Sequence, residues 1–185
     1  SYAWLGEAER SQMHYDQAKT YYARAISICT SHFLAGGTAT FYTYAGQAAF
    51  DSGDLTAAER YLAMAIRQFN AVELMWGRGV AFGYYGMLCV QQGPNQEAFD
   101  YLARAESFAP RLEICYEQGM LNRMYGQIAL RMREDARLRS VFGRYLDQSA
   151  EFYAARARKL LQNVYSPVDL LYLEQVERRA QRSIE

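Results

Sequence analysis

The chain of 185 residues has few of the side chains that usually carry catalysis or bind metals. It contains two histidines, His14 and His32, and three cysteines. An odd, small number of cysteines does not make a disulfide framework, so a reducing, cytoplasmic environment is expected. Cys29 and His32 have a ligand-like spacing, but a metal site needs more ligands than this pair supplies. The sequence therefore predicts no metal and no other cofactor.

Long apolar runs, net charge and catalytic motifs are also missing. The apolar runs are far shorter than the ~20 residues of a membrane helix. Basic and acidic side chains balance at 20 each, so the chain gains little from nucleic acid phosphates. Nucleophile-elbow, phosphate-loop, zinc-protease and dinucleotide motifs do not occur. Paired carboxylates are interpreted as solvated helix positions, and the chain is predicted not to be an enzyme; these pairs are Glu7 with Glu9 and Glu113 with Glu117.

What the chain does have is an internal repeat. Four glycines stand 40 residues apart: Gly6, Gly46, Gly86 and Gly126. In the first three units an aromatic side chain stands four residues before the glycine. Twelve residues after the first three glycines come Ala18, Ala58 and Ala98, followed at +4 by Tyr or Leu and at +7 by alanine. The i, i+4, i+7 spacing is one helix face, and small residues on it let two helices approach closely. Turn signals such as Gly53-Asp54 separate the two halves, so each unit is predicted to be a helical hairpin.

The pattern G-x11-A-x3-[YL]-x2-A, with Pro110 five residues after Ala105, resembles the tetratricopeptide repeat, whose common unit has about 34 residues. The resemblance covers roughly residues 1 to 130. It implies an all-α, right-handed solenoid of about four hairpins, over residues 1–32, 33–72, 73–112 and 113–163. The period of 40 predicts first helices lengthened at their N-terminal ends, at about 33–51, 73–91 and 113–132, with the glycine-arginine-glycine segment 77–79 inside one of them.

The two ends of the chain depart from the repeat. In the fourth unit, Leu138 and Tyr145 replace the alanines, and a helical apolar stripe is predicted over 135–162, through Val141, Tyr145, Phe152, Ala155 and Leu160. Ser166, Pro167 and Asp169 predict the start of a capping helix over 166–184 that covers the open end of the stack. By the same phase the first helix begins before Ser1, which favours a fragment of a larger protein; a native terminus with a shortened first helix is the alternative.

In tetratricopeptide arrays the first helices line a concave wall, and the resemblance places several polar side chains of this chain on it. Tyrosine, amide and arginine side chains there suit recognition of a peptide segment or a polar metabolite. The alternative is a wall that is simply polar, with the tyrosines packed on neighbouring repeats. The predicted groove residues are Arg10, Thr43, Tyr44, Gln47, Tyr84, Gln91, Arg123, Gln127 and Arg131.

Repeats of this length are similar to those in the sensor domain of the bacterial maltose-regulon activator, in receptors of quorum-sensing peptides and in scaffolds such as kinesin light chain. The resemblance implies a non-catalytic regulatory domain of a bacterial, signal-responsive transcriptional regulator that binds a peptide, protein segment or small effector. A constitutive protein-interaction scaffold and a homo-oligomerisation module through the C-terminal helices stay open. The cluster of Arg131, Arg133, Arg137 and Arg139 is either a solvated face or a docking surface for an acidic partner.

Overall fold

The computed structural model describes residues 1–72, 77–112, 115–162, 164 and 166–182. Within these residues the chain forms ten α-helices and no strand, which confirms the predicted all-α class. The helices are α1 (Tyr2–Ser11), α2 (Tyr15–Ser31), α3 (Ala35–Asp51), α4 (Leu55–Ala71), α5 (Arg78–Gln92), α6 (Gln96–Leu112), α7 (Cys115–Arg131), α8 (Ala136–Phe142), α9 (Ala150–Leu161) and α10 (Pro167–Arg182).

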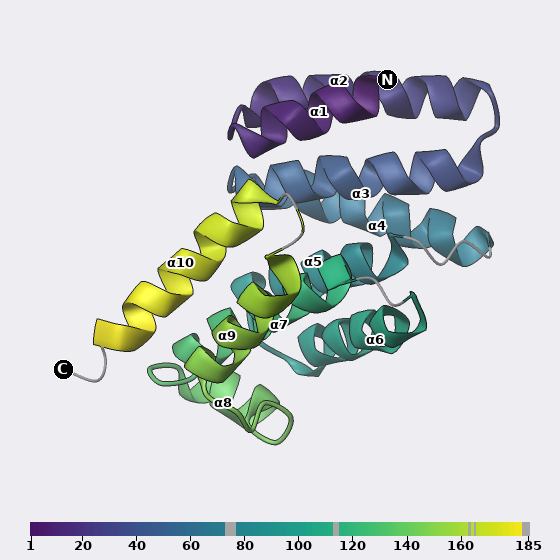
Figure 1. Cartoon of the computed structure of the whole chain (residues 1–185). Coiled ribbons are helices and arrows are strands. Elements are labelled where there is room, and N and C mark those ends of the chain that lie inside the picture. Colours follow the sequence, from purple (N-terminus) through teal and green to yellow (C-terminus); the bar gives the residue numbers. More distant parts are fainter. Residues whose placement is uncertain (73–76, 113–114, 163, 165, 183–185) are drawn as a thin grey trace.

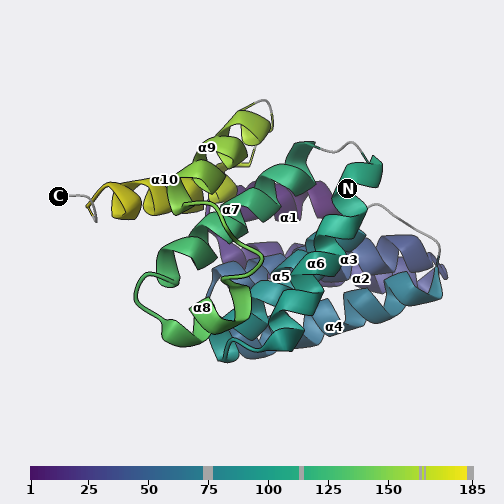
Figure 2. The same ribbon diagram turned by 90° about the horizontal axis from the view of Figure 1, so that it is seen from below.

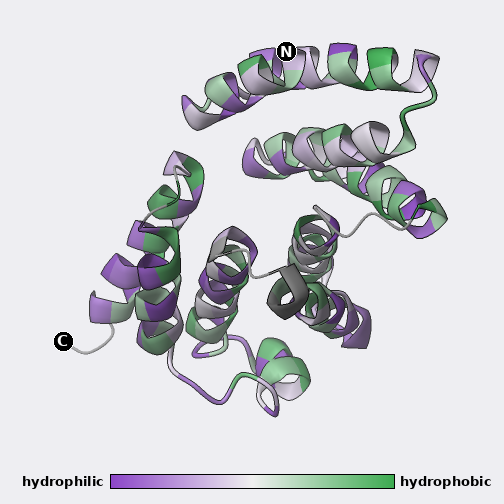
Figure 3. Ribbon diagram, turned by 45° about the vertical axis from the view of Figure 1, so that its right-hand side comes forward, coloured by the Kyte–Doolittle hydropathy of each residue, from purple (hydrophilic) through white to green (hydrophobic). Residues whose placement is uncertain are grey.

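Helices pack in pairs, which are consecutive except in the last pair, and the pairs follow one another through the molecule (Figure 1). The pairs are α1 with α2, α3 with α4, α5 with α6, and α7 with α9; further contacts between α2 and α3 and between α4 and α5 join neighbouring pairs. Figure 3 shows apolar and polar residues intermixed along the helices. None of the helices in the described part of the chain has the length and apolar character that crossing a bilayer requires.

The repeated glycines occupy equivalent contacts in the first three pairs. A Cβ on Gly46 would lie 2.6 Å from Cγ of Leu62, and one on Gly86 would lie 2.7 Å from Cγ of Leu102. A Cβ on Gly6 would collide with the ring of Tyr22 in the same way. Each glycine therefore lets the large residue 16 positions later pack directly against the first helix of its pair.

The other repeated positions also have equivalent roles. Six alanines of the second helices are buried at these contacts: Ala18, Ala25, Ala58, Ala65, Ala98 and Ala105. Tyrosines of the second helices contact an aromatic ring of the first helix in their own pair, with centroids 5.9–6.3 Å apart: Tyr2 with Tyr21, Tyr42 with Tyr61, and Phe82 with Tyr101. These tyrosines are therefore packing residues within each pair.

Helix starts are the least accurate part of the sequence prediction. Helix α3 begins at Ala35, after Leu34, and α5 begins at Arg78 rather than near residue 73. Gly77 stands outside the helix as its N-cap with φ 79°, a left-handed conformation that glycine adopts readily. Placing all of 77–79 inside a helix was therefore wrong. Leu74 and Ile114, the counterparts of Leu34, lie outside the described residues.

The fourth unit differs from the predicted continuous helix. Helix α8 ends at Phe142, and α9 begins at Ala150 with Ser149 as its cap, Oγ accepting from the Phe152 amide at 3.2 Å. It is α9 that packs against α7, while α8 contacts α6. The predicted apolar stripe is wrong because the helix is interrupted between α8 and α9, so a different set of α9 side chains faces the core. The buried residues of α9 are Ala150, Tyr153, Ala154, Ala157 and Leu161. Accordingly, a Cβ on Gly126 would meet its neighbours only at 3.4 Å or more.

Helix α10 does more than cover the last pair. It lies beside α9 and α7 (Figure 2), and its N-terminal part also reaches α1. The Tyr172 hydroxyl donates to Oδ1 of Asp51, the last residue of α3, at 3.1 Å. The helix therefore crosses from the fourth pair to the first two, along the side on which the first helices α1, α3 and α7 meet.

Candidate functional site

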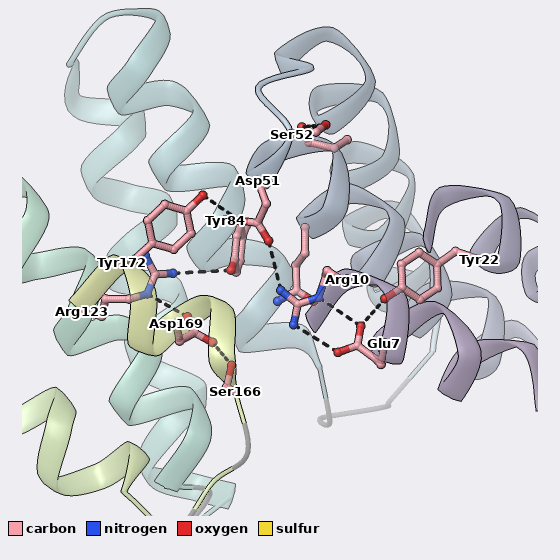
Figure 4. A network of polar contacts seen from close by, with 12 residues as sticks. Glu7, Arg10, Tyr22, Asp51, Ser52, Tyr84, Arg123, Ser166, Asp169 and Tyr172 are labelled. Atoms are coloured by element: carbon pink, nitrogen blue, oxygen red, sulfur yellow. Dashed lines mark hydrogen bonds and ion pairs between the residues drawn. The ribbon is translucent and has the colours of Figure 1, made fainter. Parts of the chain in front are cut away.

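A chain of buried polar contacts joins α1, α3, α7 and α10 (Figure 4). At its first end, the Arg10 guanidinium donates to both oxygens of Glu7 and, through Nη1, to Oδ2 of Asp51 at 3.1 Å. The Tyr22 hydroxyl donates to the same Glu7 carboxylate. Burial works to lower the pKa of Arg10, but the carboxylates of Glu7 and Asp51 raise it well above its ordinary value. Arg10 is therefore a charged, fully engaged link between α1 and α3.

The second end of the chain is the contact between α7 and α10. Arg123 Nε lies 2.8 Å from Oδ1 of Asp169, and both side chains are buried. Ser166 Oγ donates to the other oxygen, Oδ2, at 2.5 Å. Arg123 also donates to Oε1 of Gln127 at 2.9 Å. Asp169 was predicted only as an early helix residue, but its carboxylate is the partner of a predicted groove arginine.

Beside these contacts lies a cavity of about 140 Å³. Several of its lining residues are half-buried, among them Glu7, Ser11 and Tyr44. Its walls come from α1, α3, the start of α5, α7 and the residues before α10. The lining residues are Glu7, Arg10, Ser11, Thr40, Thr43, Tyr44, Gln47, Gly77, Val80, Tyr116, Glu117, Val164 and Ser166.

Glu117 is the most unusual group in this lining. The residue is 2% exposed, and its Oε2 has no hydrogen-bond partner among the described residues. Burial raises the pKa of Glu117 to about 7, although a hydrogen bond from the Gly77 backbone acts to lower it. Gly79 makes room for the carboxylate, because a Cβ there would lie 2.8 Å from Oε2. An acidic group that titrates near neutral pH inside a cavity is a candidate functional group.

The structure brings four of the nine predicted groove residues to this cavity: Arg10, Thr43, Tyr44 and Gln47. Three more do not line this cavity and belong to the contacts around Arg123. Tyr84 and Arg123 are almost completely buried, and Gln127 accepts a hydrogen bond from Arg123. Gln91 and Arg131 are exposed near the C-terminal ends of α5 and α7, apart from the cavity lining. The predicted groove is thus divided by α10 into a small cavity, a buried network and exposed ends.

Two carboxylates were misinterpreted as solvated. Glu7 is bound by Arg10 and Tyr22, and Glu117 is buried. Glu113 lies outside the described residues. The repeat contains a signal for Glu117, since the residues 40 and 80 positions earlier are Gly77 and Gly37. A carboxylate at a position that is otherwise glycine is unusual, but only the packing of α7 against α5 shows that it is buried.

The other residues that the sequence offers as candidates are the two histidines, the cysteines and the arginine cluster. His14 and His32 stand at the two ends of α2, and Cys29 and Cys89 are buried. No group of three or more potential metal ligands occurs in the described part of the chain. In the arginine cluster, Arg133 pairs with Glu151 at 2.6 Å, and Arg139 donates to the backbone oxygens of Met132 and Arg133 at the end of α7. Two of these arginines therefore join α7 to the following segments.

Comparisons of the chain with models of protein families, with curated proteins and with solved structures find no match in any of the three.

Proposed function

We propose that the chain is a tetratricopeptide-like α-solenoid that acts as a non-catalytic regulatory domain and binds a small effector in the cavity of about 140 Å³. One observation carries the proposal: a single cavity is lined by helices of all four pairs and by the segment that leads into α10. A ligand there contacts elements that are far apart in the sequence. It can therefore favour one arrangement of the pairs and of α10 over another.

A small ligand fits this proposal better than a peptide in the groove. A segment lying along α3, α5 and α7 would need the space that α10 occupies. To bind, it would have to break the Arg123–Asp169 ion pair and the Tyr172–Asp51 hydrogen bond, both of which involve buried groups. Separating such a pair leaves uncompensated buried charge, which costs about 3–5 kcal/mol. The cavity beside α10 needs no such rearrangement.

The setting that we propose is a bacterial, signal-responsive regulator, in which this domain is joined to an output domain. The repeat pattern and its likeness to bacterial sensor arrays support this setting. A constitutive scaffold is the competing proposal, and in that case a partner segment would replace α10 on the inner face. The two differ in what the protein retains from its source, a small molecule or a stoichiometric protein, and native mass spectrometry separates them.

A thermal-shift screen tests the effector proposal on the chain itself. Small amines, amino acids, sugars and nucleosides are the probes, and a ligand at about 100 times its Kd adds about 2.7 kcal/mol of stability. We expect the shift to be lost in Val80→Phe, because the larger side chain fills the cavity without removing a polar group. Gln91→Ala is the control, since Gln91 lies outside the lining. A shift that survives Val80→Phe, or one that is lost in Gln91→Ala, would contradict the proposal.

A further inference from the structure

Several polar groups of the cavity lining can act only as hydrogen-bond acceptors toward a ligand. Thr40 and Thr43 donate their hydroxyl hydrogens to the Gly36 and Ala39 carbonyl oxygens, at 3.0 Å in each case. Their oxygens can then only accept further bonds. The unpartnered Oε2 of Glu117 is also an acceptor whenever the carboxyl is ionised. A ligand that satisfies these groups must bring several donors.

The charge of the lining favours a cation. Glu7 and Glu117 supply two carboxylates, and Arg10 is the one arginine or lysine in the lining that the structure describes. The hydrogen bonds of Arg10 go to Glu7, from Nε and Nη2, and to Asp51, from Nη1, so that all three guanidinium nitrogens are engaged. With Glu117 ionised, the lining carries one net negative charge that has no partner. A buried carboxylate without a partner is stabilised strongly by a bound cation.

The size of the cavity sets the size of that cation. A dry engineered cavity of about 150 Å³ accommodates benzene, so about 140 Å³ suits a body of roughly six to eight non-hydrogen atoms. Val80 and Val164 add apolar wall to the acceptors. An inorganic ion would leave most of this space unfilled.

We infer that the cavity binds a small organic primary amine as its ammonium ion, with the Glu117 carboxylate as counter-ion and an apolar body of about this size. The inference rests on the proposed effector site and names the chemical class of its ligand. A primary ammonium has three N–H donors, which matches Glu117 and the two threonine hydroxyl oxygens.

Proton release follows from this assignment. The pKa of Glu117 is about 7 in the empty site, so at pH 7 the group is about half protonated. A bound cation favours the carboxylate, so at pH 7 binding releases about half a proton. Affinity for an ammonium ion is then roughly 30-fold weaker at pH 5.5 than at pH 8.5. The other charged or titratable groups near the cavity include Glu7 and Arg10 from α1, Tyr44 and the Arg10 partner Asp51 from α3, Arg78 from α5, Tyr116 from α7 and Asp169 from α10.

Calorimetry with cyclohexylamine and its neutral counterpart cyclohexanol tests the inference. The titrations are made at pH 7 in two buffers of different ionisation enthalpy, with wild type, Glu117→Gln and Glu134→Gln. Glu134 is an exposed carboxylate outside the lining and serves as the matched control. We expect the amine to bind wild type and Glu134→Gln with release of about half a proton. In Glu117→Gln, the affinity should fall at least tenfold and the proton release should disappear.

The outcomes separate the two proposals. Equal binding of cyclohexanol and cyclohexylamine, or amine binding without proton release, would overturn the ammonium assignment and leave the effector cavity standing. Binding of neither probe, together with no hit in the wider screen, would overturn both. Because Glu117→Gln keeps the shape of the side chain, circular dichroism is expected to report a folded variant, and loss of binding then reflects the charge.

Discussion

Arg123 Nε in α7 lies 2.8 Å from Asp169 Oδ1 in α10, and neither side chain is more than 1% exposed. This ion pair makes a predicted groove residue part of the protein's own packing. Replacing Asp169 with asparagine leaves the arginine charge buried without its counter-ion. We expect Asp169→Asn to lower the free energy of unfolding by about 3–5 kcal/mol.

Urea denaturation measures that loss, with Glu174→Gln as the control. Glu174 pairs with Arg178 at 3.3 Å on the surface of α10, where both side chains are largely exposed, so its removal should change stability by less than about 1 kcal/mol. The double variant Arg123→Met, Asp169→Leu should recover much of the lost stability. Equal, small effects of Asp169→Asn and Glu174→Gln would show that α10 is not anchored by this pair.

The repeated glycines provide a second prediction. Gly46→Ala places a Cβ 2.6 Å from Leu62 Cγ, so the Leu62 side chain or one of the two helices must move. We expect a loss of about 1–3 kcal/mol from this overpacking, measured as a change in the urea midpoint. Gly126→Ala meets its neighbours only at 3.4 Å or more, and alanine is the better helix former, so it should be neutral or slightly stabilising. A similar loss in both variants would contradict the difference between the fourth pair and the first three.

The burial of Glu117 predicts a specific pH dependence of stability. Its pKa rises from 4.5 in the unfolded chain to about 7 in the folded chain, so the folded protein holds the proton more tightly. The contribution of this group is therefore fully present below pH 4.5 and is lost as pH rises through 7. The loss amounts to about 3 kcal/mol at most.

Glu117→Gln removes that dependence. We compare the free energies of unfolding of Glu117→Gln and wild type as a difference that depends on pH. Taking the difference near pH 4.5 as the reference, we expect the variant to gain stability relative to wild type between pH 5 and pH 8. Urea melts across this range measure the difference, and Glu134→Gln, at an exposed position, should follow wild type throughout. Parallel curves for Glu117→Gln and wild type would mean that the carboxyl is not buried as described.

The attachment of α10 to α3 depends on Tyr172. Tyr172→Phe removes the hydroxyl that donates to Asp51 and keeps the ring, so it should cost about 1 kcal/mol. Hydrogen exchange should become faster for amides at the start of α10 and remain unchanged in α4. The control is Tyr145→Phe, at a half-exposed ring stacked on Phe99. If exchange in α10 is unaffected, this hydrogen bond does not hold the helix.

The repeat made much of the fold predictable from the sequence. The spacing of Gly6, Gly46 and Gly86 and of the alanines after them is a local pattern, and it identified the close contacts within three helix pairs. The fourth pair could not be predicted in the same way. The spacing of Tyr145 and Phe152 fits one face of a continuous helix, but the chain is interrupted at 143–149, so α9 buries a different face. No residue of the repeat marks that interruption.

The site was less predictable because it depends on α10. Arg10 and Gln47 were selected through the repeat phase, and they line the cavity. Tyr84 and Arg123 were selected by the same rule, yet they are buried, since a helix that begins more than 40 residues after Arg123 supplies Asp169 and Tyr172 at this face. Such a long-range contact leaves no local pattern in the sequence.

An NMR titration with cyclohexylamine tests the central claim, that a small ligand enters the cavity beside Glu117. The Gly77 backbone is hydrogen-bonded to the Glu117 carboxyl, and Gly93 at the other end of α5 is a distant reference. The account predicts saturable amide shifts at Gly77 and Gly79 in wild type, no shift at Gly93, and no shift at any of the three in Val80→Phe. Shifts that appear at Gly93 and not at Gly77, or that persist unchanged in Val80→Phe, would contradict it.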